Sequence, residues 1–126
     1  MKKILLVVSD YYKDVSQSLI KSSKKELDNF SLRIIKVPGV FEIPVTISKN
    51  INKYDAFIAL GCVIKGETPH FDFISSSTTQ AIMDLSVKHK KPIGNGIITC
   101  LNMKQAKVRG KKGKEASLAV LSVLSQ

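Results

Sequence analysis

The chain has 126 residues, 44% of them hydrophobic and 24% charged, which is typical of a single globular domain spanning residues 1–126. No apolar run is long enough to cross a membrane. The formal charge of +10 suits nucleic acid, an anionic surface or a phosphorylated small molecule. Arginine and interleaved aromatic residues, which nucleic-acid readers use, are scarce. We therefore expect small-molecule partners, without nucleic acid or membrane.

Short apolar runs alternate with helical patterns along the chain. The predicted strands cover residues 4–8, 32–37, 56–60 and 93–99. Apolar residues recur at helical spacing over residues 15–30, 71–85 and 116–124. Pro38 ends the second strand and Pro92 precedes the fourth, because proline cannot lie inside a central strand. Apolar strands separated by helices predict an α/β fold, a three-layer α/β/α domain with a four-stranded parallel sheet of the flavodoxin-like kind.

The N-terminal run ILLVV is only five residues long, and Ser9 and Asp10 follow it without a cleavage pattern. We interpret it as a buried strand and expect a cytoplasmic location. Cys62 and Cys100 form no CxxC or ligand-spaced set, which argues against a metal site and against a disulfide scaffold. We expect both cysteines to be small buried hydrophobes, with a Cys62/His70 nucleophile pair as the open alternative.

The unusual residues of the sequence gather where the predicted strands end. They occupy residues 9–12, 38–42, 61–70 and 99–102. Ligands of open parallel sheets bind outside the carboxyl ends of the strands. This edge of the sheet is therefore the expected binding site.

The segment GCVIKGET (61–68) has the position of a phosphate-binding loop, between a predicted strand and a predicted helix. Glu67 stands where such a loop carries its lysine, and a carboxylate there would repel nucleotide phosphates. A nucleoside triphosphatase is therefore not expected. A glycine turn beside a helix N-terminus still suits one small phosphate. A plain turn from strand to helix remains the alternative.

His70 follows Pro69 and is expected in the first turn of the next helix. A histidine there can both accept and donate a proton near neutral pH, as general acid–base catalysis requires. A surface or capping histidine is the alternative interpretation. His89, between two lysines at the predicted end of that helix, is expected to be solvated.

Three further groups of residues have side chains that suit a ligand. Glu42 lies among apolar residues, so its carboxylate must accept hydrogen bonds or face a ligand. Tyr11 and Tyr12 end the first strand, where a flat ring can stack on a heterocycle or simply pack against the protein. Arg109 and Lys112 form a basic pair beside a glycine, and they can hold a phosphate or lie on a solvated face.

Four segments together resemble the lumazine synthase (6,7-dimethyl-8-ribityllumazine synthase) family. VPGVFEIP resembles its V-P-G-A-F-E-I-P, and ALGCVIKGETPHFDFI resembles its L-G-x-V-I-R-G-x-T-x-H-[FY]-D-[FY]-V. PIGNGIITCLNMKQA resembles P-x-x-x-G-[IV]-[LIV]-T-x-x-[NST]-x-x-Q-A, and KGKEASLAVL resembles the closing K-G-x-[ED]-A-A-x-A helix. The resemblance covers nearly the whole chain in order. The chain departs from it at Asn95, where many members carry phenylalanine, and in a shorter loop between Arg109 and Lys112.

The resemblance implies a transferase of riboflavin biosynthesis that needs no cofactor and no metal. It would condense 5-amino-6-(D-ribitylamino)uracil with L-3,4-dihydroxy-2-butanone 4-phosphate through imine formation, phosphate elimination and ring closure. The resemblance also implies a homopentamer, or a multiple of pentamers, and association with riboflavin synthase. A flavin-binding or scaffold homologue that kept the fold without turnover is the alternative.

The same resemblance implies a role for each site residue. His70 would transfer protons, and Arg109 and Lys112 would reach the phosphate from the adjacent subunit. Glu67 and Thr68 would offer backbone N–H groups to the same phosphate. The pyrimidine and its ribityl chain would be bound by Tyr11, Val40, Phe41, Glu42, Cys62, Val63, Ile64 and Asn95.

Overall fold

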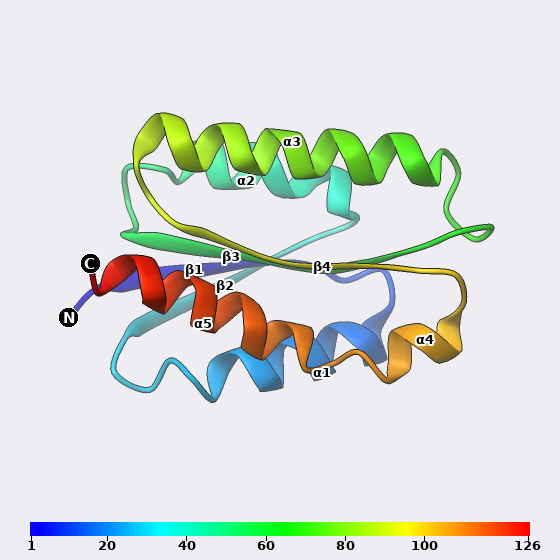
Figure 1. The fold of residues 1–126 in the computed structure, drawn as a ribbon, viewed down its shortest axis with the longest axis horizontal. Helices are drawn as coiled ribbons and strands as arrows, with labels where there is room; N and C mark the ends of the chain where they lie inside the picture. Colours follow the sequence, from blue (N-terminus) through cyan, green and yellow to red (C-terminus); the bar gives the residue numbers. More distant parts are fainter.

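The computed structural model describes all 126 residues and contains four strands and five α-helices (Figure 1). The strands are β1 (Lys3–Ser9), β2 (Ser31–Val37), β3 (Ala56–Ile64) and β4 (Ile93–Cys100). The helices are α1 (Lys13–Lys24), α2 (Ile43–Lys49), α3 (Phe71–His89), α4 (Met103–Lys107) and α5 (Lys112–Leu124), with a short 3₁₀ helix, η1 (Val40–Glu42), before α2. The predicted alternation of strands and helices is confirmed.

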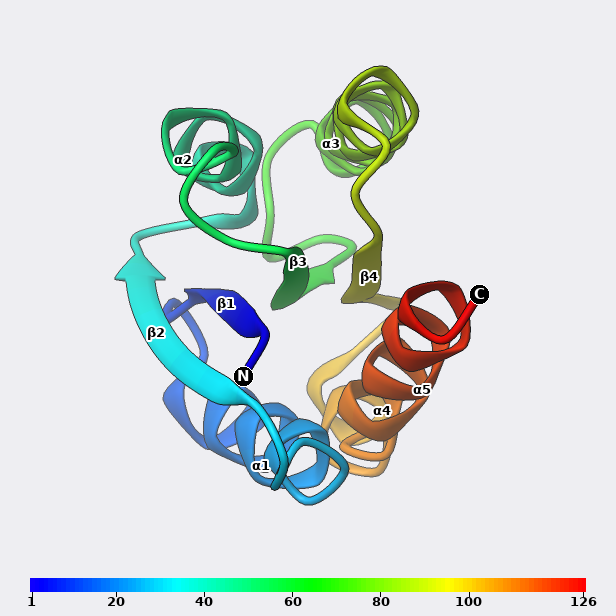
Figure 2. The same cartoon turned by 90° about the vertical axis from the view of Figure 1, so that its left-hand side faces the viewer.

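The four strands form one parallel sheet in the order β2-β1-β3-β4. Helices α2 and α3 cover one face, and α1, α4 and α5 cover the other, as Figure 2 shows in a view along the strands. This arrangement confirms the predicted three-layer α/β/α fold and its flavodoxin-like strand order. No helix in the structure is both long and apolar enough to cross a membrane.

The two faces of the sheet carry separate hydrophobic clusters. In β1, Leu5 and Val7 pack beneath α2 and α3, whereas Ile4, Leu6 and Val8 pack toward α1 and α5. Every residue of β3 is buried. Burial on both faces explains why these strands are continuously apolar in sequence instead of alternating with polar residues.

The prolines mark strand ends as expected, but two element lengths differ from the prediction. β2 ends at Val37, directly before Pro38, and β4 begins at Ile93, directly after Pro92. β3 continues to Ile64, whereas its predicted end was residue 60. The helical pattern over residues 15–30 is also too long, because α1 ends at Lys24 and the later apolar residues pack from the following loop.

Close approach of α5 to the sheet and to α1 fixes the segment before α5. A Cβ atom on Gly94 would lie 2.4 Å from the carbonyl oxygen of Ala116, so only glycine lets α5 lie this near to β4. Ser23 of α1 and Ser117 of α5 share a buried hydrogen bond of 2.6 Å between their hydroxyl oxygens. These contacts set where the loop between α4 and α5, which carries Arg109, lies against the sheet.

Candidate functional site

A hollow of about 190 Å³ lies at the carboxyl ends of β1 and β3. We call it the strand-end hollow. It is lined by Ser9, Tyr11, Tyr12, Gly39, Val40, Phe41, Cys62, Val63, Glu67, Thr68, Pro69 and Ile74. The site predicted from the strand ends therefore has a physical counterpart, and most of the residues expected to bind a pyrimidine lie around it.

Gly61 lets η1 pack directly on β3 beneath this hollow. A Cβ atom there would lie 2.8 Å from Cγ1 of Val40 and 2.9 Å from Cβ of Ser9, closer than real Cβ contacts allow. The expectation that Gly61 opens a loop is wrong, because residues 61–64 belong to β3. Without a side chain at Gly61, Val40 of η1 can lie directly against β3, where it lines the hollow.

The turn after β3 covers residues 65–70 and folds back on the strand. The backbone N–H groups of Glu67 and Thr68 donate to the carbonyl oxygen of Ile64, at 3.2 and 2.9 Å. The Thr68 hydroxyl accepts from the Ile64 N–H at 3.3 Å, and Gly66 has a left-handed φ of 87°. Both N–H groups expected to bind phosphate therefore already have an acceptor, which a phosphate would have to displace.

His70 lies at the end of this turn with an exposed side chain. The expectation that it sits in the first turn of the helix is wrong: α3 begins at Phe71, and His70 precedes it with φ 57° and ψ 39°. Its carbonyl oxygen accepts from the N–H of Ile74 at 2.9 Å, and its imidazole makes no hydrogen bond within the chain. Pro69 before it and Ile74 after it line the strand-end hollow, whereas His70 itself does not.

Tyr11 and Tyr12 differ in exposure although both line the hollow. Their ring centroids lie 4.8 Å apart with an interplanar angle of 61°, an edge-to-face contact. Tyr12 packs against the core, and burial raises the pKa of its phenol. Tyr11 is 63% exposed, so its ring has a free face on which a flat heterocycle can stack.

Glu42 has a local structural partner. Its carboxylate oxygen Oε1 accepts a hydrogen bond of 2.9 Å from the backbone N–H of Gly39 and so closes η1 at its N-terminus. The side chain is half-buried and does not line the strand-end hollow. Of the two expectations for this carboxylate, a hydrogen bond or a ligand, the structure supplies the hydrogen bond.

The cysteines behave as buried hydrophobes. Burial, with a further contribution from neighbouring Cys100, raises the pKa of the Cys62 thiol to about 12. The thiol is therefore protonated at neutral pH and unsuited to nucleophilic attack. Ile64 was expected to contact the pyrimidine, but its side chain is fully buried in the core toward α1 and α5. It therefore does not line the hollow.

Arg109 lies at a second hollow of about 510 Å³, which we call the arginine hollow. It is lined by Ile97, Ile98, Thr99, Val108, Arg109, Lys111, Lys112 and Glu115. The guanidinium Nη1 donates to the carbonyl oxygen of Thr99 at 3.0 Å and to Sγ of Cys100 at 3.7 Å. Within one chain the basic pair Arg109 and Lys112 thus shares no hollow with the residues around His70.

Asn95 lines neither hollow. It is exposed on β4, the edge strand of the sheet, and its Oδ1 accepts from the backbone N–H of Ile97 at 3.1 Å. Its amide nitrogen remains available to a ligand or a neighbouring molecule. No group of three or more histidine, cysteine, aspartate and glutamate residues is arranged to hold a metal ion.

A profile of the family described as 6,7-dimethyl-8-ribityllumazine synthase matches residues 1–126. The chain belongs to the lumazine synthase family. The 6,7-dimethyl-8-ribityllumazine synthase of Methylorubrum populi is 39% identical over 98% of this chain and 81% of its own length. The 6,7-dimethyl-8-ribityllumazine synthase 1 of Rhodopseudomonas palustris is also 39% identical, over 97% of this chain and 83% of its own length. A de novo designed Rossmann fold protein, ROS2_835, is 17% identical with a TM-score of 0.47, covering 91% of this chain and 99% of that one.

In this lumazine synthase homologue, four residues that line the strand-end hollow had no individual role predicted from the sequence. Ser9, Gly39 and Pro69 lie within the strand-end ranges 9–12, 38–42 and 61–70, so their place at this edge of the sheet was expected. Ile74 lies outside those ranges, in the first turn of α3. Its spacing from His70 does not mark it, because His70 precedes the helix with a left-handed backbone.

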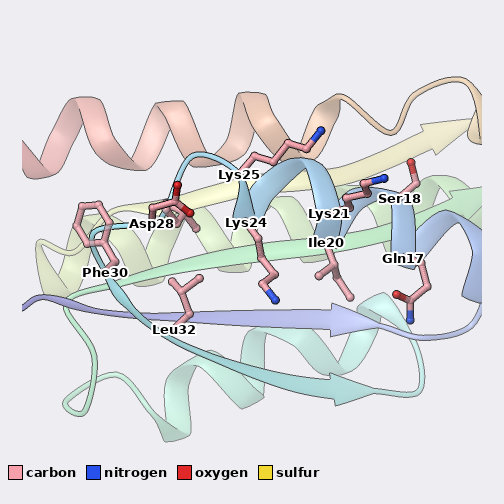
Figure 3. A pocket seen from close by; sticks show the side chains of 10 residues that line it. Gln17, Ser18, Ile20, Lys21, Lys24, Lys25, Asp28, Phe30 and Leu32 are labelled. Carbon is pink, nitrogen blue, oxygen red and sulfur yellow. The ribbon is translucent and has the colours of Figure 1, made fainter.

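The largest hollow of the molecule lies elsewhere and contains no predicted site residue. It has a volume of about 980 Å³ and lies between α1 and β2, with lysines of α1 at its edge and apolar side chains at its base (Figure 3). We call it the α1–β2 hollow. Figure 3 shows Lys24 extending to the opposite side of α1 from Lys25. Three lysines and Asp28 line this hollow, but none of the residues singled out from the sequence does, so size does not identify the proposed site here.

Proposed function

We propose that this chain is a lumazine synthase that condenses 5-amino-6-(D-ribitylamino)uracil with L-3,4-dihydroxy-2-butanone 4-phosphate. The product is 6,7-dimethyl-8-ribityllumazine, and water and inorganic phosphate are released. The observation that carries the proposal is family membership over the whole chain, 1–126, which we interpret as a single domain. Relatives that bear the name of this enzyme share 39% of their aligned residues with it.

The strand-end hollow supports the pyrimidine half of this function. Tyr11 has an exposed ring face for stacking, and Val40 and Val63 supply apolar walls. Phe41 is 59% exposed at the rim, where it can cover a bound ring. We assign Cys62 to the wall as a protonated thiol. Ile64 is left out of the assignment because its side chain is buried.

The reaction needs proton transfer beside that ring. Attack of the 5-amino group on the butanone carbonyl forms a C–N bond, and loss of water leaves the imine. Loss of inorganic phosphate then leaves an enol at the carbon that carried the 3-hydroxyl group, and this enol tautomerises to a new carbonyl. Attack of the ribitylamino nitrogen on that carbonyl closes the second ring, with loss of water. Each step moves a proton, and we assign these transfers to the imidazole of His70, which has no hydrogen-bond partner within the chain and follows Pro69, a lining residue of the hollow. Glu42 would meet the ribityl chain through the carboxylate oxygen that Gly39 does not occupy.

The phosphate half of the site is assigned to Arg109, Lys112 and the turn around Glu67 and Thr68. Arginine suits a phosphate because its planar guanidinium donates two parallel hydrogen bonds. In one chain Arg109 lines the arginine hollow, whereas the turn that ends at His70 lines the strand-end hollow through Glu67, Thr68 and Pro69. A site that uses both is therefore completed by a second copy, and we propose a homopentamer or a multiple of pentamers. Asn95, on the open edge of β4, would face the neighbouring copy.

Exposed apolar side chains support assembly. Phe73 and Val87 of α3 are each 69% exposed, Val108 beside Arg109 is 77% exposed, and Leu101 is 62% exposed. Apolar side chains this exposed in a short chain favour burial between copies. We further propose a cytoplasmic location and association with riboflavin synthase, both of which rest on the family resemblance alone.

The decisive test mixes both substrates with the purified protein and follows the absorbance and fluorescence of the lumazine. We expect product to form well above the spontaneous rate without any added metal or cofactor. Product at only the spontaneous rate would overturn the proposal and favour a homologue that binds ligand without turnover. No specific observation favours that second function at present.

A further inference from the structure

A fourth hollow, which we call the lysine hollow, has no part in the proposed function. Its volume is about 330 Å³. Residues of α1 form one side and residues of the α4–α5 segment the other: Ser18, Lys21, Ser22, Lys25, Lys107, Val108, Gly110 and Lys111. Four of these eight side chains are lysines, and no carboxylate lines the hollow. Four positive charges are thus gathered there without a matching negative charge.

The two sides of the lysine hollow are held together by packing. The Ser22 hydroxyl donates to the carbonyl oxygen of Gly110 at 2.5 Å. Ser18 fills the space that a Cβ atom on Gly110 would need. The lysines of α1 are therefore fixed opposite those of the α4–α5 segment, although about 86 positions separate them in sequence. The cationic arrangement belongs to the fold and does not depend on a mobile tail.

The lysine hollow is continuous with the arginine hollow. Val108 and Lys111 line both, so positive charge extends from Lys21 and Lys25 through Lys111 to Arg109. Figure 3 shows Lys21 and Lys25 extending from α1 away from Lys24.

No salt bridge joins any of the four lysines of this hollow to a carboxylate. The one salt bridge of the molecule joins Lys114 to Glu26, at 3.8 Å, and involves none of the four lysines. Asp28 lines the adjoining α1–β2 hollow, and Glu115 lines the arginine hollow.

We propose that the lysine hollow collects phosphate monoester dianions and passes them to Arg109, so that it raises the affinity of the site for its phosphorylated substrate. This inference rests on the proposed function. A surface of one charge sign beside a binding site raises the local concentration of ions of the opposite sign. The effect weakens as salt shortens the screening length from about 30 Å at 0.01 M to about 8 Å at 0.15 M.

The test compares two variants that lose the same net charge. One carries Lys21→Gln, Lys25→Gln, Lys107→Gln and Lys111→Gln. The control carries Lys2→Gln, Lys49→Gln, Lys53→Gln and Lys88→Gln, four exposed lysines at the amino-terminal end of the sheet. All eight side chains are at or near the surface, so both variants are expected to fold, as circular dichroism would verify.

In the first variant, KM for the phosphorylated butanone is expected to rise about threefold to tenfold at 0.01 M ionic strength and less than about twofold at 0.15 M. In the control variant, that KM is expected to stay near the wild-type value. The kcat and the KM for the pyrimidine should be unchanged in both. Replacement of the same four lysines of the hollow by arginine should restore the wild-type KM, because the charge is retained.

The outcomes separate this inference from the proposed function. Equal KM values in the two glutamine variants, or a rise that salt does not reduce, would overturn the collecting role while turnover leaves the proposed function standing. A wild-type protein without turnover would overturn both.

Discussion

His70 combines an exposed imidazole with a left-handed backbone (φ 57°). Asparagine tolerates that conformation better than alanine does, so His70→Asn removes the imidazole with little backbone strain. We expect kcat to fall about 10²- to 10⁴-fold, which is the usual contribution of a general acid–base group. The thermal midpoint should stay within a few degrees of the wild-type value. His89→Asn, at the far end of α3, serves as the control, and an equal loss of kcat there would contradict the assignment.

Arg109 is the residue most directly linked to phosphate. Loss of a charge-assisted hydrogen bond pair in Arg109→Ala should raise KM for the phosphorylated butanone about tenfold to a hundredfold. Binding of the pyrimidine should change little. Arg33→Ala removes the chain's other arginine, on the exposed surface of β2, and should leave both constants unchanged. Steady-state kinetics with each substrate varied would check this, and equal losses for both substrates would count against the phosphate role.

Cys62 allows a prediction about alkaline pH. Its pKa rises from the ordinary value of 9.0 to about 12 in the folded chain, chiefly because the thiol is buried. The unfolded chain therefore releases this proton at a lower pH than the folded chain does. The contribution of the buried thiol to the free energy of unfolding is fully present below pH 9 and is lost as pH rises from 9 toward 12. Thermal unfolding of Cys62→Val between pH 8 and 10 should show a weaker alkaline decline than that of the wild type, and equal declines would refute the prediction.

The sequence predicted the position of residues well where the strand end alone fixed it, although their roles stay predictions. Tyr11, Val40 and Cys62 line the strand-end hollow because the carboxyl ends of parallel strands meet at one edge. Ile64 was misplaced because β3 is buried on both faces, and its sequence carries no alternation that tells one face from the other. The bond between Glu42 and Gly39 needed the three-residue turn η1, which leaves no periodic pattern.

At the scale of elements, the contact between η1 and β3 holds the wall of the strand-end hollow. Gly61→Ala would place a Cβ atom 2.8 Å from Val40, so η1 must shift. We expect a loss of about 1–3 kcal/mol in the free energy of unfolding, as for other overpacked sites. We also expect weaker pyrimidine binding, because Val40 lines the hollow.

Gly94→Ala is the matched control for this prediction. Its Cβ atom would meet the backbone of α5, which is remote from the strand-end hollow, so it should destabilise the chain without changing the pyrimidine KM of the folded protein. Urea unfolding and pyrimidine KM would be measured for both variants. Unchanged pyrimidine binding in Gly61→Ala would show that η1 does not shape the site.

Element lengths were predicted less well than element order. Glycine at position 61 suggested the end of β3, but Gly61 lies within the strand and is needed there because η1 packs directly against it. The helical pattern over residues 15–30 extended past α1 because Leu27 remains buried beyond the helix. Apolar periodicity reports burial, and a loop that crosses the core is buried as well.

At the scale of the whole molecule, the separation of His70 from Arg109 predicts complementation between copies. With the phosphorylated butanone held well below the KM of the Arg109→Ala chain, the His70→Asn and Arg109→Ala chains should each show little activity alone. Dissociation and joint reassembly of equal amounts should restore about a quarter of the wild-type activity, because about one site in four then has both intact groups in a closed ring. No recovery after verified reassembly would mean that both groups act within one chain.

The sequence alone cannot describe what a second copy contributes. The basic pair Arg109 and Lys112 suggested a phosphate by itself, but only the family resemblance joined Arg109 to His70 across two subunits, since nothing in the spacing of the chain relates the two residues. Length and composition of one chain do not encode the geometry of an interface, which depends on side chains from separate elements such as Phe73 and Val108. Measurement of mass in solution gives the number of copies in the assembly directly.

The hydrogen bond from the Ile97 N–H to Asn95 Oδ1 has a consequence for self-association. β4 is an edge strand, and a free row of N–H groups there would invite a foreign strand to add to the sheet, the first step toward fibres. With the amide side chain already accepting from one of those groups, an incoming strand would have to break that bond before it could pair. A folded chain that has lost its neighbours is to that extent protected against open-ended polymerisation along β4.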